Sequence, residues 1–147
     1  METHRELVDI ISDFESGREA YRSFTSRGDL NKHSLLEFQG RFIDLKAELR
    51  HWKKYLTNEW TRRDDKAATA IKFRIAIAIS RGEFKDDKGD LIYEKCSITS
   101  AEKYASGSQA YKEFVDQRAF YKESITNVSD LREDLNSYIN EIKDRLK

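Results

Sequence analysis

Apolar residues recur at helical spacing along much of the chain, and the clearest run lies between residues 33 and 68. Alternate steps of three and four positions separate them, which is typical of a heptad seam on an amphipathic helix. The members of this seam are Leu35, Phe38, Phe42, Leu45, Leu49, Trp52 and Leu56. A weaker pattern of the same kind predicts a helix and a turn over residues 1–30.

A second long seam predicts a helix over residues 99–147. It begins at Thr99-Ser100-Ala101-Glu102, where a hydroxyl and a carboxylate have the spacing of a capping box. We expect this helix to pack lengthwise on the 33–68 helix and on neighbouring copies of the chain. The seam residues that we assign to oligomerisation are Tyr111, Phe114, Tyr121, Ile125, Val128, Leu135, Ile139 and Ile142.

The period changes to two between these seams. Alternate positions from Ile71 to Ile79 are large and apolar, which predicts a half-buried strand, with helix as the alternative. The glycine-containing, charged residues that follow predict an exposed loop that closes a hairpin. The expected fold is therefore mainly α, in a single domain over residues 1–147. A short β element is expected near residues 71–96, within a segment over residues 70–97 that forms a strand or hairpin and a loop.

Composition favours long helices that bury apolar stripes against partners. Of the 147 residues, 37% are charged, 12% are aromatic and none is proline, and the net charge is zero. The one cysteine, Cys96, excludes an intrachain disulfide framework and favours a reducing compartment. We find no secretory signal pattern and no apolar run near the roughly 20 residues of a membrane span. These features predict a cytoplasmic protein, in the host cell if the chain is encoded by a phage.

No motif indicates catalysis, a metal or a cofactor. The chain has no HExxH, CxxC or glycine-rich phosphate-binding motif, and its three histidines lie far apart in the sequence. We therefore expect a protein that is not an enzyme and that carries neither a metal nor a cofactor.

Positive charge is concentrated in one part of the chain. Residues 41–74 hold 10 basic and 5 acidic side chains, a balance of +5. Such a stretch fits an anion-binding element, and a solvated helix face is the alternative. On a strand, Lys72 and Arg74 would share one face beside small alanines, as a phosphate-binding pair or as charges that protect an edge strand. The candidate nucleic-acid-binding residues are Lys72, Arg74, Arg62, Arg63, Lys66, Arg50, Lys53 and Lys54.

The order of several short motifs resembles that of the UvsY-type recombination mediators of T-even-like phages. The matching motifs are Ile71-Lys72-Phe73-Arg74-Ile75, Ser80-Arg81-Gly82, Tyr93-Glu94-Lys95 and Ser100-Ala101-Glu102-Lys103. The resemblance covers roughly residues 45–145.

The resemblance implies a homo-oligomeric, ring-like protein without catalytic activity. It implies that the protein binds single-stranded DNA, contacts a RecA-like recombinase and a single-strand-binding protein, and helps to load the recombinase. Only Lys72 and Arg74 inherit a DNA-binding role from the family pattern. The alternatives are a helical oligomeric scaffold or adaptor, or a small phage inhibitor of a host protein, neither of which binds nucleic acid.

Overall fold

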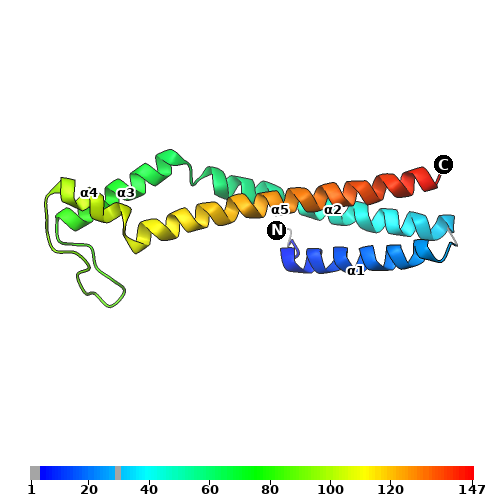
Figure 1. Cartoon of the computed structure of the whole chain (residues 1–147), viewed down its shortest axis with the longest axis horizontal. Helices are drawn as coiled ribbons and strands as arrows, with labels where there is room; N and C mark the ends of the chain where they lie inside the picture. The colour runs from blue at the N-terminus through cyan, green and yellow to red at the C-terminus, as the bar shows by residue number, and fades with distance from the viewer. Residues whose placement is uncertain (1–3, 29–30) are drawn as a thin grey trace. The chain divides into compact units, whose positions relative to one another are not determined.

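The computed structural model describes residues 4–28 and 31–147, and the described chain is mainly helical (Figure 1). In chain order the helices are α1 (Leu7–Ser26), α2 (Lys32–Thr61), α3 (Asp65–Ser80), α4 (Ile98–Ser106) and α5 (Gln109–Arg145). The predicted mainly α class is confirmed. The turn expected at the end of the 1–30 segment falls partly on residues 29 and 30, which lie outside the described residues, as do residues 1–3.

The chain divides into two compact units. The single domain expected over residues 1–147 stays a prediction. The first unit comprises the chain up to Leu56 together with Ser124–Lys147, and the second comprises Thr57–Glu123. Helices α2 and α5 each contribute residues to both units. No helix in the described part of the chain is long and apolar enough to cross a bilayer.

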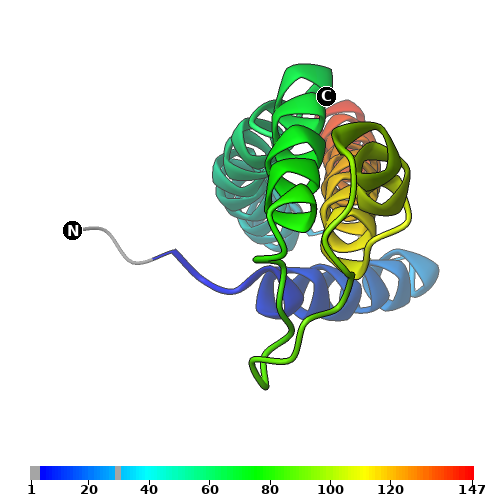
Figure 2. The same cartoon turned by 90° about the vertical axis from the view of Figure 1, so that its left-hand side faces the viewer.

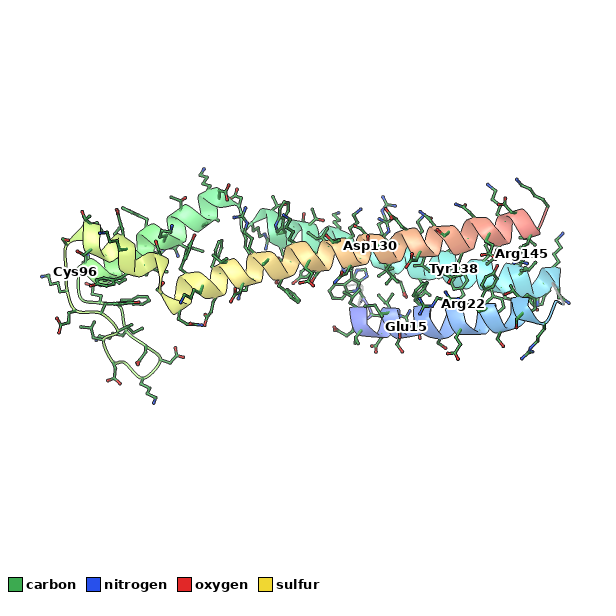
Figure 3. All side chains as sticks on the ribbon, in the orientation of Figure 1. Glu15, Arg22, Cys96, Asp130, Tyr138 and Arg145 are labelled. Atoms are coloured by element: carbon green, nitrogen blue, oxygen red, sulfur yellow. The ribbon has the colours of Figure 1, made fainter. Side chains whose placement is uncertain are left out.

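The first unit is built from α1, most of α2 and the C-terminal part of α5 around an aromatic core. The ring of Tyr21 lies edge-on to Phe38, Phe42 and Tyr138, with centroids 5.5, 5.9 and 5.7 Å away. Figure 3 labels Tyr138 on α5. The buried apolar side chains of this unit are Ile10, Phe14, Tyr21, Leu35, Phe42, Leu45, Leu49, Leu56, Val128, Leu135 and Ile142. The apolar spacing of residues 33–56 thus correctly indicates which side of α2 is covered.

Gly17 of α1 lies against the side chains of Arg41 and Phe42 on α2. It is buried, and a Cβ atom added there would lie 3.2 Å from Nε of Arg41 and 3.4 Å from Cε1 of Phe42. A glycine in a helix interior costs about 1 kcal/mol relative to alanine. Here the glycine leaves room for the side chains of Arg41 and Phe42, against which the Cβ atom of an alanine would press.

The second unit is centred on the packing of α3 against α4, which lie side by side (Figures 1 and 2). Its buried side chains are Ile75, Ala76, Ile79, Ala101 and Ala105. Three of these five are alanines, so the two helices can approach closely. Partly buried hydrophobic residues complete this small core, namely Ile71, Phe84, Tyr93, Cys96 and Tyr111.

The predicted β element is wrong, because residues 71–80 belong to α3. The helix is started by Asp64, whose carboxylate accepts a hydrogen bond of 2.8 Å from the backbone N–H of Ala67. Large apolar residues at every second position also recur at every fourth, so Ile71, Ile75 and Ile79 fall on one side of a helix as well as on one side of a strand. The neighbouring alanines favour the helix.

The loop between α3 and α4 contains no strand, and its tip extends away from both helices (Figures 1 and 2). Lys85 and Leu91 form an isolated antiparallel bridge, and the backbone N–H of Ile92 donates to the carbonyl oxygen of Phe84 at 3.0 Å. Gly89 turns the chain between them with φ +85°. The expected loop is confirmed, but the pairing across it is too short to make a hairpin of strands.

Both predicted long helices are interrupted. The 33–68 helix stops at Thr61, and the 99–147 helix is divided into α4 and α5 by Gly107 and Ser108. The cap of α4 is Ser97, whose hydroxyl accepts from the N–H of Ser100 at 3.3 Å, so the predicted capping box at Thr99 is wrong. Buried Ser108 accepts from the N–H of Tyr111 at 3.3 Å and thereby starts α5.

Candidate nucleic-acid interface

Lys72 and Arg74 do not share a face. Two residues apart on an α-helix, they point in directions that differ by about 200°. Lys72 is half-buried, with its ammonium group 4.8 Å from the centre of the Tyr111 ring on α5. Arg74 is exposed on another side of α3, where it borders a hollow of about 300 Å³ that is otherwise apolar, beside Phe84 and Ala110. The prediction of a two-residue phosphate-binding face fails together with the strand.

Arg62 and Arg63 lie in the turn between α2 and α3, and both are paired with Glu59. Their guanidinium groups lie 3.1 Å from the two carboxylate oxygens of that residue. Arg63 is also held 4.6 Å from the centre of the Tyr121 ring, whereas Arg62 is largely exposed. The turn therefore presents one exposed guanidinium group, and Glu59 offsets part of its charge.

The remaining candidates are divided between the two units. Lys66 is exposed on the first turn of α3, in the second unit. Arg50, Lys53 and Lys54 lie on the part of α2 that belongs to the first unit, where Arg50 and Lys54 are exposed and Lys53 is half-buried. Within that unit, Arg50 and Lys54 are one turn apart and so lie on the same side of α2.

Helix α3 also presents an aromatic ring to solvent. The side chain of Phe73 is 55% exposed, although it lies between the two cations that the sequence singled out. Lys66 precedes Phe73 by seven residues, or about two turns, so both lie on the same outward side of α3. An exposed phenyl ring with an ammonium group on the same helix face is the combination from which single-strand-binding surfaces are built.

A cleft of about 460 Å³ lies between α3 and α4. One wall carries Thr69, Lys72 and Phe73, and the other carries Thr99, Glu102, Lys103 and Ser106. Two ammonium groups face one carboxylate, so the ionisable side chains of the cleft carry a net charge of +1 at neutral pH.

Of the residues that line this cleft, sequence reasoning singled out only Lys72, and the missed residues include Lys103 and Phe73. Both stand inside quoted motifs, Ser100-Ala101-Glu102-Lys103 and Ile71-Lys72-Phe73-Arg74-Ile75, so their positions were visible. Their proximity was not visible, because it depends on how α3 packs on α4.

The described residues contain no group of three or more histidine, cysteine, aspartate or glutamate side chains able to hold a metal ion. Cys96 is free and packs against the small core of the second unit.

The chain matches no protein-family model, no curated protein and no solved structure. The resemblance to UvsY-type mediators rests on the sequence motifs alone.

Proposed function

We propose that the protein is a non-catalytic recombination mediator that binds single-stranded DNA and helps to load a RecA-like recombinase onto it. The observation that carries this proposal is the exposed ring of Phe73 on the same side of α3 as Lys66, with Lys72 and Arg74 beside it in the sequence. Cations hold phosphates, and an aromatic ring stacks on a base whatever the base is. The family resemblance, which carries a DNA-binding role onto Lys72 and Arg74, supports the same assignment.

Weak binding by each copy is part of the proposal. Mediation requires that the strand be handed on, and a neutral chain with a local group of cations holds DNA less firmly than a strongly basic one. A homo-oligomeric ring would raise the overall affinity through effective concentration while each contact stays weak. The side chain of Val115 on α5, which is 44% exposed, is available for contacts with other copies, with the recombinase or with the single-strand-binding protein.

The test is fluorescence anisotropy with labelled oligo-dT at several salt concentrations, together with light scattering for the mass. We expect binding that weakens as salt rises, a mass above 17.3 kDa and little preference between dT and mixed sequence. A second assay uses strands coated with single-strand-binding protein, in a buffer with the pH and salt of the host cytoplasm. It measures whether the protein shortens the lag before a RecA-like recombinase assembles on these strands. Absence of binding at low salt would favour the adaptor function instead.

A further inference from the structure

The cleft between α3 and α4 has the lining residues and the volume of a small-ligand site. Thr69, Lys72 and Phe73 lie within about one turn of α3 and therefore line one side of that helix. On α4, Thr99, Glu102, Lys103 and Ser106 follow the spacing of a single helix face. The volume of about 460 Å³ falls within the range of roughly 300–1,000 Å³ in which small-molecule sites occur.

The cleft exists because the helices meet through small side chains. Ala76, Ala101 and Ala105 are fully buried at the contact, so the backbones of α3 and α4 come close there. The longer side chains of Lys72, Phe73 and Lys103 line the hollow, which is open to solvent.

We infer that this cleft holds one nucleotide of the bound single strand, with its base against the ring of Phe73 and its phosphate between the ammonium groups of Lys72 and Lys103. The inference rests on the proposed function and names the subsite at which that function acts. Arg74 lies on another side of α3 and contacts a different part of the strand.

The polar groups of the cleft suit a nucleotide better than a simple anion. The hydroxyl of Thr69 donates to the carbonyl oxygen of Asp65 at 2.9 Å, and that of Ser106 donates to the carbonyl oxygen of Glu102 at 3.2 Å. With their protons already used, these oxygens accept, as the carboxylate of Glu102 does. The N–H groups of a base can donate to these acceptors, while the ammonium groups of Lys72 and Lys103 hold the phosphate of the same nucleotide.

The position of Lys72 supports the same assignment. Its ammonium group is held against the ring of Tyr111 at 4.8 Å, so part of the conformational entropy of this long side chain is already lost before a phosphate arrives. Lys103 stands in the last turn of α4 and is exposed, so it can close over the phosphate from the other wall.

The experiment compares three labelled strands of equal length, oligo-dT, oligo-dA and an abasic strand with the same phosphates. We expect the wild-type protein to bind both base-bearing strands about tenfold more tightly than the abasic strand at one salt concentration. Phe73→Leu should remove that preference and leave the salt dependence unchanged. Lys103→Gln should keep the preference and lower the log–log salt slope by about 0.7.

Matched controls on α5 separate this subsite from a general surface effect. Phe120→Leu removes a ring that is even more exposed than that of Phe73, and Lys112→Gln removes an exposed ammonium group outside the cleft. Both should bind all three strands as the wild type does. Circular dichroism and melting temperature establish that each variant is folded, which we expect because Phe73 and Lys103 are exposed.

Failure of the inference and failure of the proposed function give different results. If the wild-type protein binds none of the strands at low salt, the proposed function is wrong. If it binds them but Phe73→Leu keeps the preference for bases, the protein still binds single strands and the cleft is not the nucleotide subsite. Equal loss of preference in Phe120→Leu and Phe73→Leu would also overturn the subsite.

Discussion

The imidazole rings of His4 and His51 are stacked, with their centroids 3.3 Å apart and their planes within 11° of parallel. The adjoining residue, Arg5, forms ion pairs with Asp13 and Glu48. Its carbonyl oxygen accepts a hydrogen bond of 2.8 Å from Nε1 of Trp52. The segment before α1 is therefore held against α2 by contacts that include a titratable pair.

Acidification should weaken this contact. Burial lowers the pKa of His51 below its ordinary value of 6.5, and the positive charges of His4 and Lys54 lower it further. A lowered pKa means that folding favours the neutral ring, so the stabilisation is complete above about pH 6.5 and is lost as the pH falls below it. Thermal melting between pH 8 and pH 5 should show this loss.

His51→Phe keeps a ring that can stack but cannot titrate, and we expect it to flatten the pH dependence. His33→Phe is the matched control, because the side chain of His33 is 82% exposed and its pair with Glu37 is therefore worth little. An identical dependence on pH in His51→Phe and the wild type would contradict the assignment to His51.

Tyr21→Phe should destabilise the first unit by about 1 kcal/mol at neutral pH. The hydroxyl of Tyr21 donates to Glu141 at 3.1 Å inside the aromatic core, and phenylalanine preserves the packing while removing that bond. Glu141 keeps its ion pair with Arg145 at 3.0 Å, which limits the loss. Urea denaturation measures the difference, with Tyr138→Phe as the matched control in the same cluster.

The same tyrosine predicts an alkaline effect. Burial, followed by the hydrogen bond to Glu141, raises the pKa of Tyr21 to about 12. Because this lies above the value of about 10 in an unfolded chain, the stabilisation is complete below pH 10 and is lost as the pH rises from about 10 to about 12. The advantage of the wild type over Tyr21→Phe should shrink across that range, and a constant difference would show that the hydroxyl is not held as described.

Leu135→Asp and Ile139→Asp should have different effects. Leu135 is fully buried within the first unit, so an aspartate there should cost several kcal/mol and unfold that unit. Ile139 is half-buried and belongs to the proposed oligomerisation set, so its replacement should lower the mass in solution with a smaller change in melting temperature. Light scattering and thermal melting measure both, and an unchanged mass for Ile139→Asp would remove that residue from the interface between copies.

Lys72→Ala and Arg74→Ala should each lower the salt slope of single-strand binding by about 0.7. Since the two side chains lie on different sides of α3, their effects on affinity should add in the double variant. Lys72→Ala also loses the contact with Tyr111, so its melting temperature is measured alongside. Lys88→Ala, in the exposed loop, is the control, and a double variant that binds oligo-dT as the wild type does would remove the family-based assignment.

The spacing of apolar residues determined the helical class of this protein and the buried side of α2. Each turn of a helix brings residues three and four apart to one side, so a stripe such as Leu35, Phe42 and Leu49 can be recognised without knowing what covers it. The exposed loop after residue 80 could also be predicted from neighbouring residues alone, because glycines and charged residues together disfavour both a helix and a buried strand. The break at Gly107 and Ser108 is also local, because glycine disfavours the helix interior and the hydroxyl of Ser108 caps α5.

Tertiary structure decided what local periodicity leaves open. The run from Ile71 to Ile79 satisfies the spacing of a strand and of a helix. Ile75 and Ala76 are buried together in the core with Ala101 and Ala105 of α4, which a helix allows and a strand, whose neighbouring side chains face opposite sides, does not. That choice separates Lys72 from Arg74 and brings Phe73 and Lys103 to one cleft. Tertiary packing also brings the rings of His4 and His51 together. The two residues are far apart in the sequence, and no periodic pattern indicates that they are neighbours. Periodicity assigns each residue to a side of its own element, and only the packing of one element on another determines which distant side chains become neighbours.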